Sequence, residues 1–360
     1  MKIKLFQPYI GDAAKVNVQR VLNGTQIAQG PEVDLFEREF AAQFGFEPWQ
    51  VVSLNSGTSA LELAYDLAKV DQFSTVLTPL LTCTATNIPL VRRKANMSFI
   101  DVEGKNHLNM DPEMLEYQLE DRTNWPKKVV VFVHFGGSSA GLEEVEVLSG
   151  NHNADLICDA AQALGSRLSK VARFNAISLQ AIKSLTAGDG GVLVCRDRED
   201  AQNARKLRWF GYDREIKQLR GDTDLSLAGY KMHMNDISAA IARGNLMEWK
   251  KIVEHRQGIN HVYESHWSEN AVKGSGRLVP GIWNPSVIGF DYHEAKMLSE
   301  DAGFEIGQHH YRNDKYSIFR SAYSNCPNMD EIGNNYFMLP CHMGMTLDDA
   351  HLIASTLWGN

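Results

Sequence analysis

The chain has 360 residues, 44% of them hydrophobic, and a formal net charge of −8 from 36 basic and 44 acidic residues. This length exceeds that of most single compact domains, so we expect two domains, or one large domain with a smaller lobe. The acidic balance excludes a general nucleic-acid binder, although one lysine and a few backbone N–H groups suffice for a local phosphate site.

Cysteine usage and hydropathy bear on the cellular compartment. The five cysteines are scattered, odd in number and without a C-x-x-C spacing: Cys83, Cys158, Cys195, Cys326 and Cys341. A reducing cytoplasm is therefore expected. No segment is apolar enough to span a membrane, and the N-terminal residues lack the apolar stretch of a signal peptide. The pair Cys341-His342 near Cys326 fits no zinc spacing, so we expect no metal.

The first half of the chain alternates between expected helices and strands. In chain order, the sequence predicts a helix from Pro31 to before Gly45, a strand at 51–54, a helix at 60–69, a strand at 74–77, a helix at 85–93, a strand at 97–100, a helix at 112–119, a strand at 129–133, a helix at 142–148 and a strand at 155–158. The strand at 129–133 is rich in β-branched residues, which is typical of burial on both faces. This βαβ alternation predicts an α/β fold with a mainly parallel sheet between helices.

The pattern changes after residue 158. Two adjacent strands are expected at 174–178 and 191–195, and a long helical stretch follows Asn235. A strand at 286–290, a helix from His293 and a terminal helix from Leu347 indicate a smaller α+β lobe. We therefore expect a large domain at 1–246 and a small C-terminal domain at 247–360.

Lys183 is the first candidate for chemistry. It is a lone lysine among apolar and small residues, between the two adjacent strands. An amine removed from water has a lowered pKa and can act as a nucleophile. The alternative is a solvated loop lysine.

Asp159 follows the apolar residues of the strand expected at 155–158. A carboxylate at the carboxyl end of a buried parallel strand lies at the edge where such sheets bind ligands. The alternative is a cap on a following helix, which is a commoner role for aspartate.

The segment Asn55–Leu61 lies between a strand and a helix and contains Ser56, Gly57 and Thr58. Free N–H groups and the dipole at a helix N-terminus form an anion site, although an ordinary Ser/Thr cap is the alternative. Ser178 lies five residues before Lys183 and could add a hydroxyl to the same anion. A dinucleotide-binding loop is a different reading, and this segment lacks its glycine spacing.

These three features occur in the order that a pyridoxal 5′-phosphate (PLP) enzyme with a parallel sheet would use. PLP requires a phosphate cradle, a lysine for the Schiff base and a carboxylate against the pyridine nitrogen, which keeps the ring able to draw electrons from the substrate carbon. Over nearly its whole length the chain resembles the sugar aminotransferases related to DegT, DnrJ, EryC1 and StrS. The segments that support the resemblance are Ala28–Glu37, Asn55–Leu61, Asp159–Ala163, Ser178–Gly191 and Gly229–Ala240.

The resemblance implies the aspartate-aminotransferase fold, PLP fold type I, and a role for each matched residue. Lys183 would form the Schiff base and later act as acid and base, and Asp159 would pair with the pyridine nitrogen. Gln162 would contact the ring face or its 3′-oxygen. The phosphate would be bound by a cradle of four residues: Ser56, Gly57, Thr58 and Ser178. In the family the segment around 229–234 comes from the second subunit, so Lys231 would reach the phosphate of a partner in a homodimer with shared active sites.

Several positions depart from the family pattern. Many relatives have a ring-stacking aromatic where this chain has Cys83, and many have His where it has Gln180. Relatives that act as sugar dehydratases replace the Schiff-base lysine with His, so Lys183 favours transamination. Lys231, where many relatives have Asn, is shared with members resembling GDP-perosamine synthases, and a cation there would strengthen a contact with phosphate.

The C-terminal lobe departs most. By resemblance, the segment His309–Asp314 contributes to the substrate pocket, so His309 and Tyr311 are candidate substrate residues. Two further features stay open at this point. Arg208–Arg214 could bind a nucleotide or form a structural loop near a dimer interface, and His134 could line the site or simply pack beside it.

The sequence thus predicts a PLP-dependent aminotransferase that moves an amino group from an amino acid, by analogy glutamate, to a nucleotide-linked keto-deoxysugar in amino-sugar or polysaccharide biosynthesis. The alternatives are a PLP-dependent sugar dehydratase and a non-catalytic PLP-binding regulator on the same fold.

Overall fold

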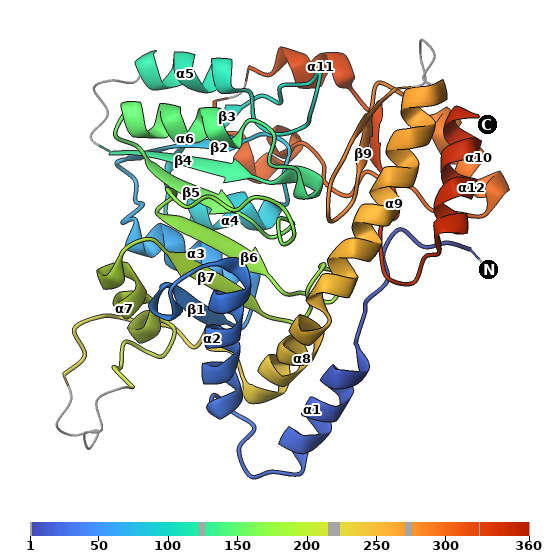
Figure 1. Ribbon diagram of the computed structural model, residues 1–360. Helices are drawn as coiled ribbons and strands as arrows, with labels where there is room; N and C mark the ends of the chain where they lie inside the picture. Colours follow the sequence, from blue (N-terminus) through green and yellow to red (C-terminus); the bar gives the residue numbers. More distant parts are fainter. Residues whose placement is uncertain (1, 122–126, 215–223, 271–275, 324, 360) are drawn as a thin grey trace.

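The computed structural model describes residues 2–121, 127–214, 224–270, 276–323 and 325–359 (Figure 1). Its centre is a seven-stranded sheet with the strand order β1-β7-β6-β5-β4-β2-β3. The strands are β1 (Val51–Leu54), β2 (Ser74–Pro79), β3 (Asn96–Ile100), β4 (Lys127–Val133), β5 (Asp155–Asp159), β6 (Phe174–Ser178) and β7 (Gly191–Cys195). Each strand predicted for this part of the chain is present.

The sheet is parallel except at β7. Strands β3, β2, β4, β5 and β6 pair in parallel with their neighbours, whereas β7 runs antiparallel to both β6 and β1. The predicted mainly parallel sheet is therefore confirmed. Because the parallel strands point the same way, their carboxyl ends meet at one edge, which is where such sheets bind ligands.

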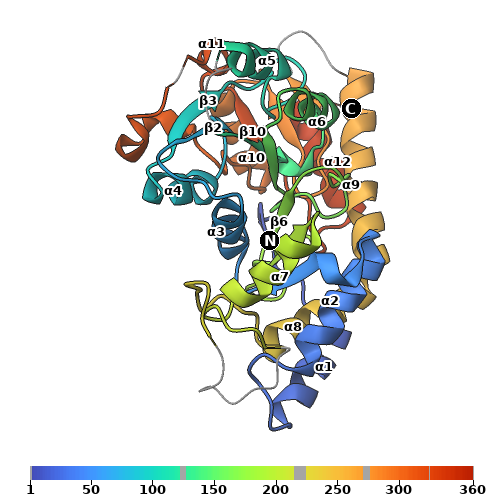
Figure 2. The ribbon, with the colours of Figure 1, turned by 90° about the vertical axis from the view of Figure 1, so that its left-hand side faces the viewer.

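Helices cover both faces of the sheet. Figure 2 shows α3 and α4 on one side, and α2 and α6 on the other. Strand β4 is buried from both sides, because Val129 and Val131 join one hydrophobic cluster while Val130 and Phe132 join another. The helices of this part are α1 (Asp12–Leu22), α2 (Pro31–Phe44), α3 (Gly57–Leu67), α4 (Thr84–Arg92), α5 (Pro112–Asp121), α6 (Leu142–Asn151), α7 (Arg198–Leu207) and α8 (Asp236–Met247).

The C-terminal part forms a second, smaller sheet of order β10-β9-β8, antiparallel throughout. Its elements are α9 (Trp249–Asn270), β8 (Arg277–Val279), β9 (Ser286–Ile288), α10 (Tyr292–Ala302), α11 (Pro327–Ile332), β10 (Tyr336–Met338) and α12 (Leu347–Trp358). Helices α9, α10 and α12 pack together and share a hydrophobic cluster with the sheet. The N-terminal residues also join this part, because Ile3 forms a bridge with Phe304.

The long helical stretch predicted after Asn235 is two helices. Helix α8 ends at Met247 and α9 begins at Trp249, and Glu248 between them has φ −98° and ψ 9°. The division into domains at 1–246 and 247–360 falls beside this break and stays a prediction.

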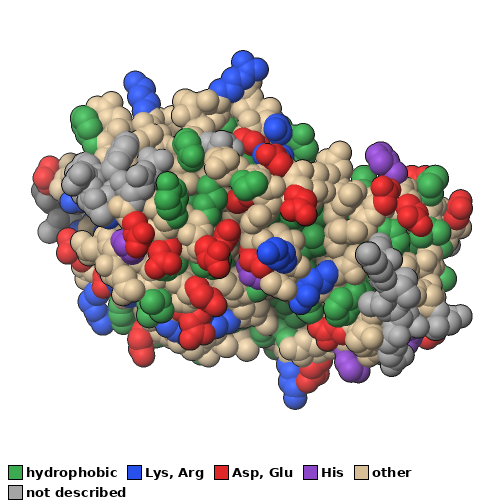
Figure 3. All heavy atoms as spheres, turned by 90° about the horizontal axis from the view of Figure 1, so that it is seen from above, with side chains coloured by type: hydrophobic (Ala, Val, Ile, Leu, Met, Phe, Trp, Pro, Cys, Tyr) green, Lys and Arg blue, Asp and Glu red, His purple; other side chains and the backbone are tan. Residues whose placement is uncertain are grey.

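The surface of the protein is mixed in charge on the face that is viewed from above. On the face shown in Figure 3, acidic side chains lie among the basic ones, and no continuous basic patch is visible there. None of the five cysteines, all of which are described, forms a disulfide. Among the described residues, no helix is long and apolar enough to cross a membrane.

Candidate active site

The candidate site lies where β5 and β6 end. Asp159 is the last residue of β5 and Ser178 the last of β6. Gly57 begins α3 directly beside Ser178, because a Cβ added at Gly57 would lie 2.7 Å from the Ser178 Cβ. The sheet therefore brings together groups that are separated by more than 100 positions in the sequence.

Asp159 is buried, with 5% of its surface exposed. One carboxylate oxygen accepts a hydrogen bond from the Thr86 hydroxyl at 2.7 Å, and the other accepts from the Ala161 N–H at 3.1 Å. A turn rather than a helix follows Asp159, so it caps no helix. Burial raises the pKa of this carboxyl group, while Thr86, Ala161 and the nearby charge of Lys183 oppose the shift. A cationic partner is the group that this buried carboxylate would accommodate.

Lys183 follows a turn after β6 and does not extend into solvent. Its Nζ lies 3.9 Å from the centre of the Trp283 ring. Burial lowers the pKa of Lys183 to about 8, against the opposing charges of Asp159 and Cys83. At pH 7 about a tenth of the amine is therefore unprotonated and able to attack a carbonyl carbon, far more than for an ordinary lysine.

The N-terminus of α3 has the form of an anion cradle. The Ser56 side chain caps the helix by accepting from the Ser59 N–H at 3.0 Å. Gly57 is buried against Ser178, and Thr58 is exposed at the first turn. A side chain larger than hydrogen at Gly57 would occupy the space in front of the Ser178 hydroxyl. The free N–H groups of the helix and this hydroxyl are suited to a phosphate group.

Gln162 and His310 form a buried hydrogen-bonded pair. The Gln162 carbonyl oxygen accepts from the Gly136 N–H at 2.7 Å, so its amide nitrogen is the donor to His310 Nε2, also at 2.7 Å. His310 Nε2 must then be unprotonated, and burial holds the pKa of His310 well below its ordinary value. Both polar ends of Gln162 are thus engaged within the protein, which leaves the face of its amide for contact with a ring.

The segment at 309–313 forms the C-terminal wall of the site. Asn313 ties it to the turn before α4, through its N–H to Leu80 O at 2.9 Å and its side-chain amide to Thr82 O at 2.8 Å. His309 lies near Lys183, whose charge, after burial, helps lower the pKa of His309 to about 4. Tyr311 is 45% exposed and packs against Tyr316, so it lies on the outer side of this wall.

The chain is similar to known aminotransferases over almost its whole length. The model of the DegT/DnrJ/EryC1/StrS aminotransferase family matches residues 8–358. The chain belongs to this family. A transaminase from Campylobacter jejuni named for UDP-4-amino-4,6-dideoxy-N-acetyl-beta-L-altrosamine is 27% identical, over 94% of this chain and 92% of its own.

Two further proteins are similar to this chain, one in sequence and one in solved structure. The spore coat polysaccharide biosynthesis protein SpsC of Bacillus subtilis is 30% identical over 78% of this chain and 70% of its own. The crystal structure of AtS13 from Actinomadura melliaura superposes with a TM-score of 0.90 at 27% identity, over 100% and 99% of the two chains. Solved structures of the same fold include PLP and PMP forms. As a member of the DegT/DnrJ/EryC1/StrS family, whose aminotransferases depend on PLP, the enzyme is a PLP-dependent aminotransferase of fold type I.

The residues present fit PLP. Among the described residues, the buried Asp159 carboxylate accepts hydrogen bonds from Thr86 and Ala161 but forms no ion pair. The amine of Lys183 is partly neutral, and the α3 cradle has no Cβ at Gly57. These three features match, respectively, the pyridine nitrogen, the aldehyde and the phosphate of the cofactor.

Two other predicted residues, Cys83 and Lys231, are both exposed but have different neighbours. Cys83 caps the N-terminus of α4 and is exposed. The pKa of its thiol is raised by the protein packed around it and responds to the charges of both Asp159 and Lys183, so it lies near them. Lys231 is exposed, and its neighbours Tyr230 and Met232 bond to the residues that end α7. Within one chain, Lys231 thus lies on a segment beside α7 rather than at Lys183.

The two features left open by the sequence have structural surroundings. In the segment 208–214, the Arg214 guanidinium lies 4.9 Å from the Trp209 ring, and Trp209 forms a bridge with Lys231. His134 is fully buried against Phe132, at 5.0 Å between ring centres, on the sheet face opposite to α3. His134 therefore packs beside the sheet and does not line the site.

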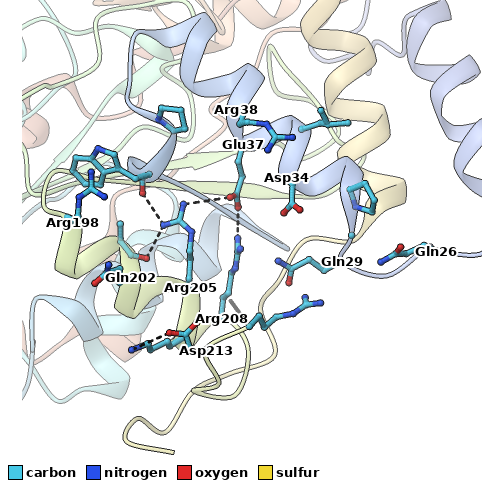
Figure 4. Close-up of a pocket in the computed structure, with 18 residues that line it drawn as sticks. Gln26, Gln29, Asp34, Glu37, Arg38, Arg198, Gln202, Arg205, Arg208 and Asp213 are labelled. Atoms are coloured by element: carbon cyan, nitrogen blue, oxygen red, sulfur yellow. Dashed lines mark hydrogen bonds and ion pairs between the residues drawn. The ribbon is translucent and has the colours of Figure 1, made fainter. Parts of the chain in front are cut away.

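A hollow of about 1030 Å³ lies between α2 and α7, and Lys183 is not among the residues that line it (Figure 4). Figure 4 shows Arg205 and Arg208 pointing toward Glu37. The Arg208 guanidinium donates to Glu37 at 2.5 Å. Burial favours a high pKa for Glu37, but Arg208 and Arg205 outweigh it and hold the pKa below its ordinary value. None of the residues lining this hollow belongs to the cluster around Lys183.

Sequence reasoning missed several residues of the site. Thr86 bonds Asp159, His310 bonds Gln162, and Trp283 contacts Lys183. Thr86 lies three residues after Cys83, and His310 lies in the segment 309–314, but neither was singled out. Trp283 had no sequence signal. Each of the three is far in sequence from the residue that it contacts. His342 bonds Lys4 O at 2.8 Å, and no group of three potential metal ligands occurs among the described residues.

Proposed function

We propose that this aminotransferase moves an amino group from glutamate to a nucleotide-linked keto-deoxysugar. The observation that supports an amino-group transfer best is the placement of a partly neutral Lys183 amine beside the buried Asp159 carboxylate at one sheet edge. The sugar substrate rests on the names of relatives, which include a UDP-sugar transaminase and a polysaccharide biosynthesis protein.

Each residue has a separate task in this proposal. When bound, PLP supplies an aldehyde that condenses with amines and a ring that draws electrons from the carbon bearing the nitrogen. Lys183 would hold the cofactor through its aldehyde carbon, with loss of water, and its Nζ, once freed, would accept and return the proton that moves during transfer. Asp159 would hold the proton on the pyridine nitrogen, and the amide face of Gln162 would limit ring movement.

The phosphate and the substrate occupy opposite ends of the site in the proposal. The α3 cradle, with Ser56, Gly57, Thr58 and Ser178, binds the phosphate. His309 and Tyr311 contact the sugar. A homodimer completes each site, with Lys231 of one copy reaching the phosphate bound to the other. The domains at 1–246 and 247–360 enclose the site. The cytoplasm is the proposed compartment, because the five cysteines form no disulfide.

The test is an absorbance spectrum of the protein with PLP, before and after glutamate, for the native enzyme and Lys183→Ala. We expect a band near ~420 nm that requires Lys183 and that glutamate shifts to ~330 nm as the conjugation is lost. A UDP-linked 4-keto-6-deoxysugar should then restore the ~420 nm band and gain nitrogen by mass spectrometry.

Other results assign other functions. A band that forms with PLP but never responds to any amino acid would favour a PLP-binding regulator. Loss of water from the sugar without gain of nitrogen would favour a dehydratase. Absence of any Lys183-dependent band would overturn the proposal.

A further inference from the structure

Trp283 forms the surface on which the Lys183 amine rests. The ring is fully buried, and Lys183 Nζ lies 3.9 Å from its centre. The indole N–H donates to the Ile182 carbonyl oxygen at 2.9 Å, so the same side chain also bonds the residue that precedes Lys183. Trp283 thus contacts both the amine and the main chain that positions it, from 101 residues away.

Trp283 is fixed in place by a stacking contact to its ring and by hydrogen bonds to its main chain. Phe6 stacks against it at 5.2 Å between ring centres and an interplanar angle of 23°. The main-chain N–H of Trp283 donates to Gly136 O at 3.1 Å. Arg256 on α9 is buried and donates to the carbonyl oxygens of Trp283 and Cys341. These bonds connect the main chain of Trp283 to the segment after β4, to α9 and to the segment after β10, so both parts of the molecule set the position of the residue.

The electrostatics of the ring suit the released amine. A buried ammonium group is disfavoured by the loss of water, and the negative face of an indole partly replaces that water. The carboxylate of Asp159 contributes an opposing charge, but it is already bonded to Thr86 and Ala161. His309 and His310 lie near the amine and are neutral, so they add no repulsion.

We propose that Trp283 is a positioning residue that holds the Lys183 amine in place whenever the amine is not bonded to the cofactor. The proposal rests on the proposed function in one respect, that Lys183 is the amine that bonds the cofactor. It adds that the C-terminal part of the chain, through Trp283, controls the position and protonation of this amine.

The experiment replaces Trp283 alone with tryptophans of increasing fluorine content. Fluorine withdraws electron density from the ring face while the ring shape and the N–H donor are retained. The pKa of Lys183 is then measured in the cofactor-free protein, from the pH dependence of its acylation by acetic anhydride, followed by mass spectrometry. We expect a stepwise fall of the pKa, by about half a unit in total, because the ammonium form loses its favourable contact.

The matched control is the same fluorotryptophan series at Trp267 on α9, whose indole N–H donates to Gly276 O at 3.0 Å. Substitution there should leave the pKa of Lys183 unchanged. A pKa that stays constant across the Trp283 series would show that Trp283 is only a core residue and would overturn the proposal.

A second variant guards against loss of folding. Trp283→Phe keeps a ring face but loses the bond to Ile182, so we expect the pKa of Lys183 to stay close to its native value. In Trp283→Leu no ring face is left, so we expect the pKa of Lys183 to fall. Failure of this inference is distinguishable from failure of the function. If the ~420 nm band depends on Lys183 but the pKa ignores fluorination, only the inference fails; if the pKa responds but no band forms with PLP, only the proposed function fails.

Discussion

The two walls of the active site are built in different ways. The wall with Asp159, Ser178 and Gly57 comes from neighbouring strands and one helix N-terminus, and strand register sets its geometry, since Asp159 pairs with Ala176 and Ser178 with Gly191. The wall with Trp283, His309 and His310 comes from the C-terminal part. Isolated hydrogen bonds attach it to the first wall, such as those from the main-chain N–H and the side-chain amide of Asn313 to Leu80 O and Thr82 O.

The difference teaches which part of the chemistry each wall can support. Groups fixed by a sheet keep their separation, so the bonds to a cofactor that every reaction needs are best placed there. Groups attached through isolated hydrogen bonds can change without disturbing the sheet, and such positions suit the recognition of one substrate among many. We therefore expect substitutions on the two walls to have effects of different kinds.

The largest effect is expected at the sheet wall. Asp159→Asn removes the charge that would hold a proton on the pyridine nitrogen, and we expect transamination with glutamate to fall on the order of 10³-fold. Stopped-flow measurement of the glutamate half-reaction provides the rate. Thr86→Val is the control, since it removes one hydrogen bond to the carboxylate without removing its charge and should cost far less. Equal losses in both variants would contradict the assignment of Asp159.

The protonation of Lys183 predicts a pH dependence for PLP binding by the cofactor-free enzyme. Because the pKa of Lys183 is lowered to about 8, the neutral amine that attacks PLP is lost as the pH falls below 8. The rate of attachment should fall about tenfold per pH unit below 8 and level off above it. An ordinary lysine would instead show a rate that still rises above pH 9, and that profile would refute the burial argument.

Within the C-terminal wall, the two candidate substrate residues His309 and Tyr311 should affect the sugar and not the cofactor. For His309→Ala we expect an unchanged spectrum with PLP and an unchanged glutamate half-reaction, but a KM for the sugar raised about tenfold, the cost of one buried hydrogen bond. Tyr311→Phe, at the exposed side of the wall, should change KM by less. A loss confined to the glutamate half-reaction would place His309 with the sheet wall instead.

The smallest effect is expected at Cys83, between the two walls. Cys83→Phe restores an aromatic where many relatives have one, and we expect PLP to bind about threefold more tightly through ring stacking. Equilibrium dialysis with PLP measures this, with Cys326→Ala as a control thiol remote from Lys183 in sequence and buried. Weaker binding in Cys83→Phe would mean that the position has no room for a ring.

Much of the sheet wall was predictable from the sequence. The runs at 51–54, 155–158 and 174–178 contain apolar residues in lengths suited to strands, and Asp159, Ser178 and Lys183 stand at or after their ends. Hydrophobic patterning places such ends at one sheet edge because parallel strands share a direction. The break at Glu248 was missed, because the apolar spacing continues from α8 into α9 without a proline or glycine at the break.

The sequence by itself determined the order of the elements, the parallel sheet and the identity of the groups that can bind a cofactor, since these depend on local patterning and on short motifs. Only the tertiary structure decided that Trp283 supports Lys183, that His310 bonds Gln162 and that His134 faces away from the site. These contacts join residues about 100 or more positions apart or depend on which face of a strand a side chain occupies, and they follow from packing of the whole core, which no local pattern encodes.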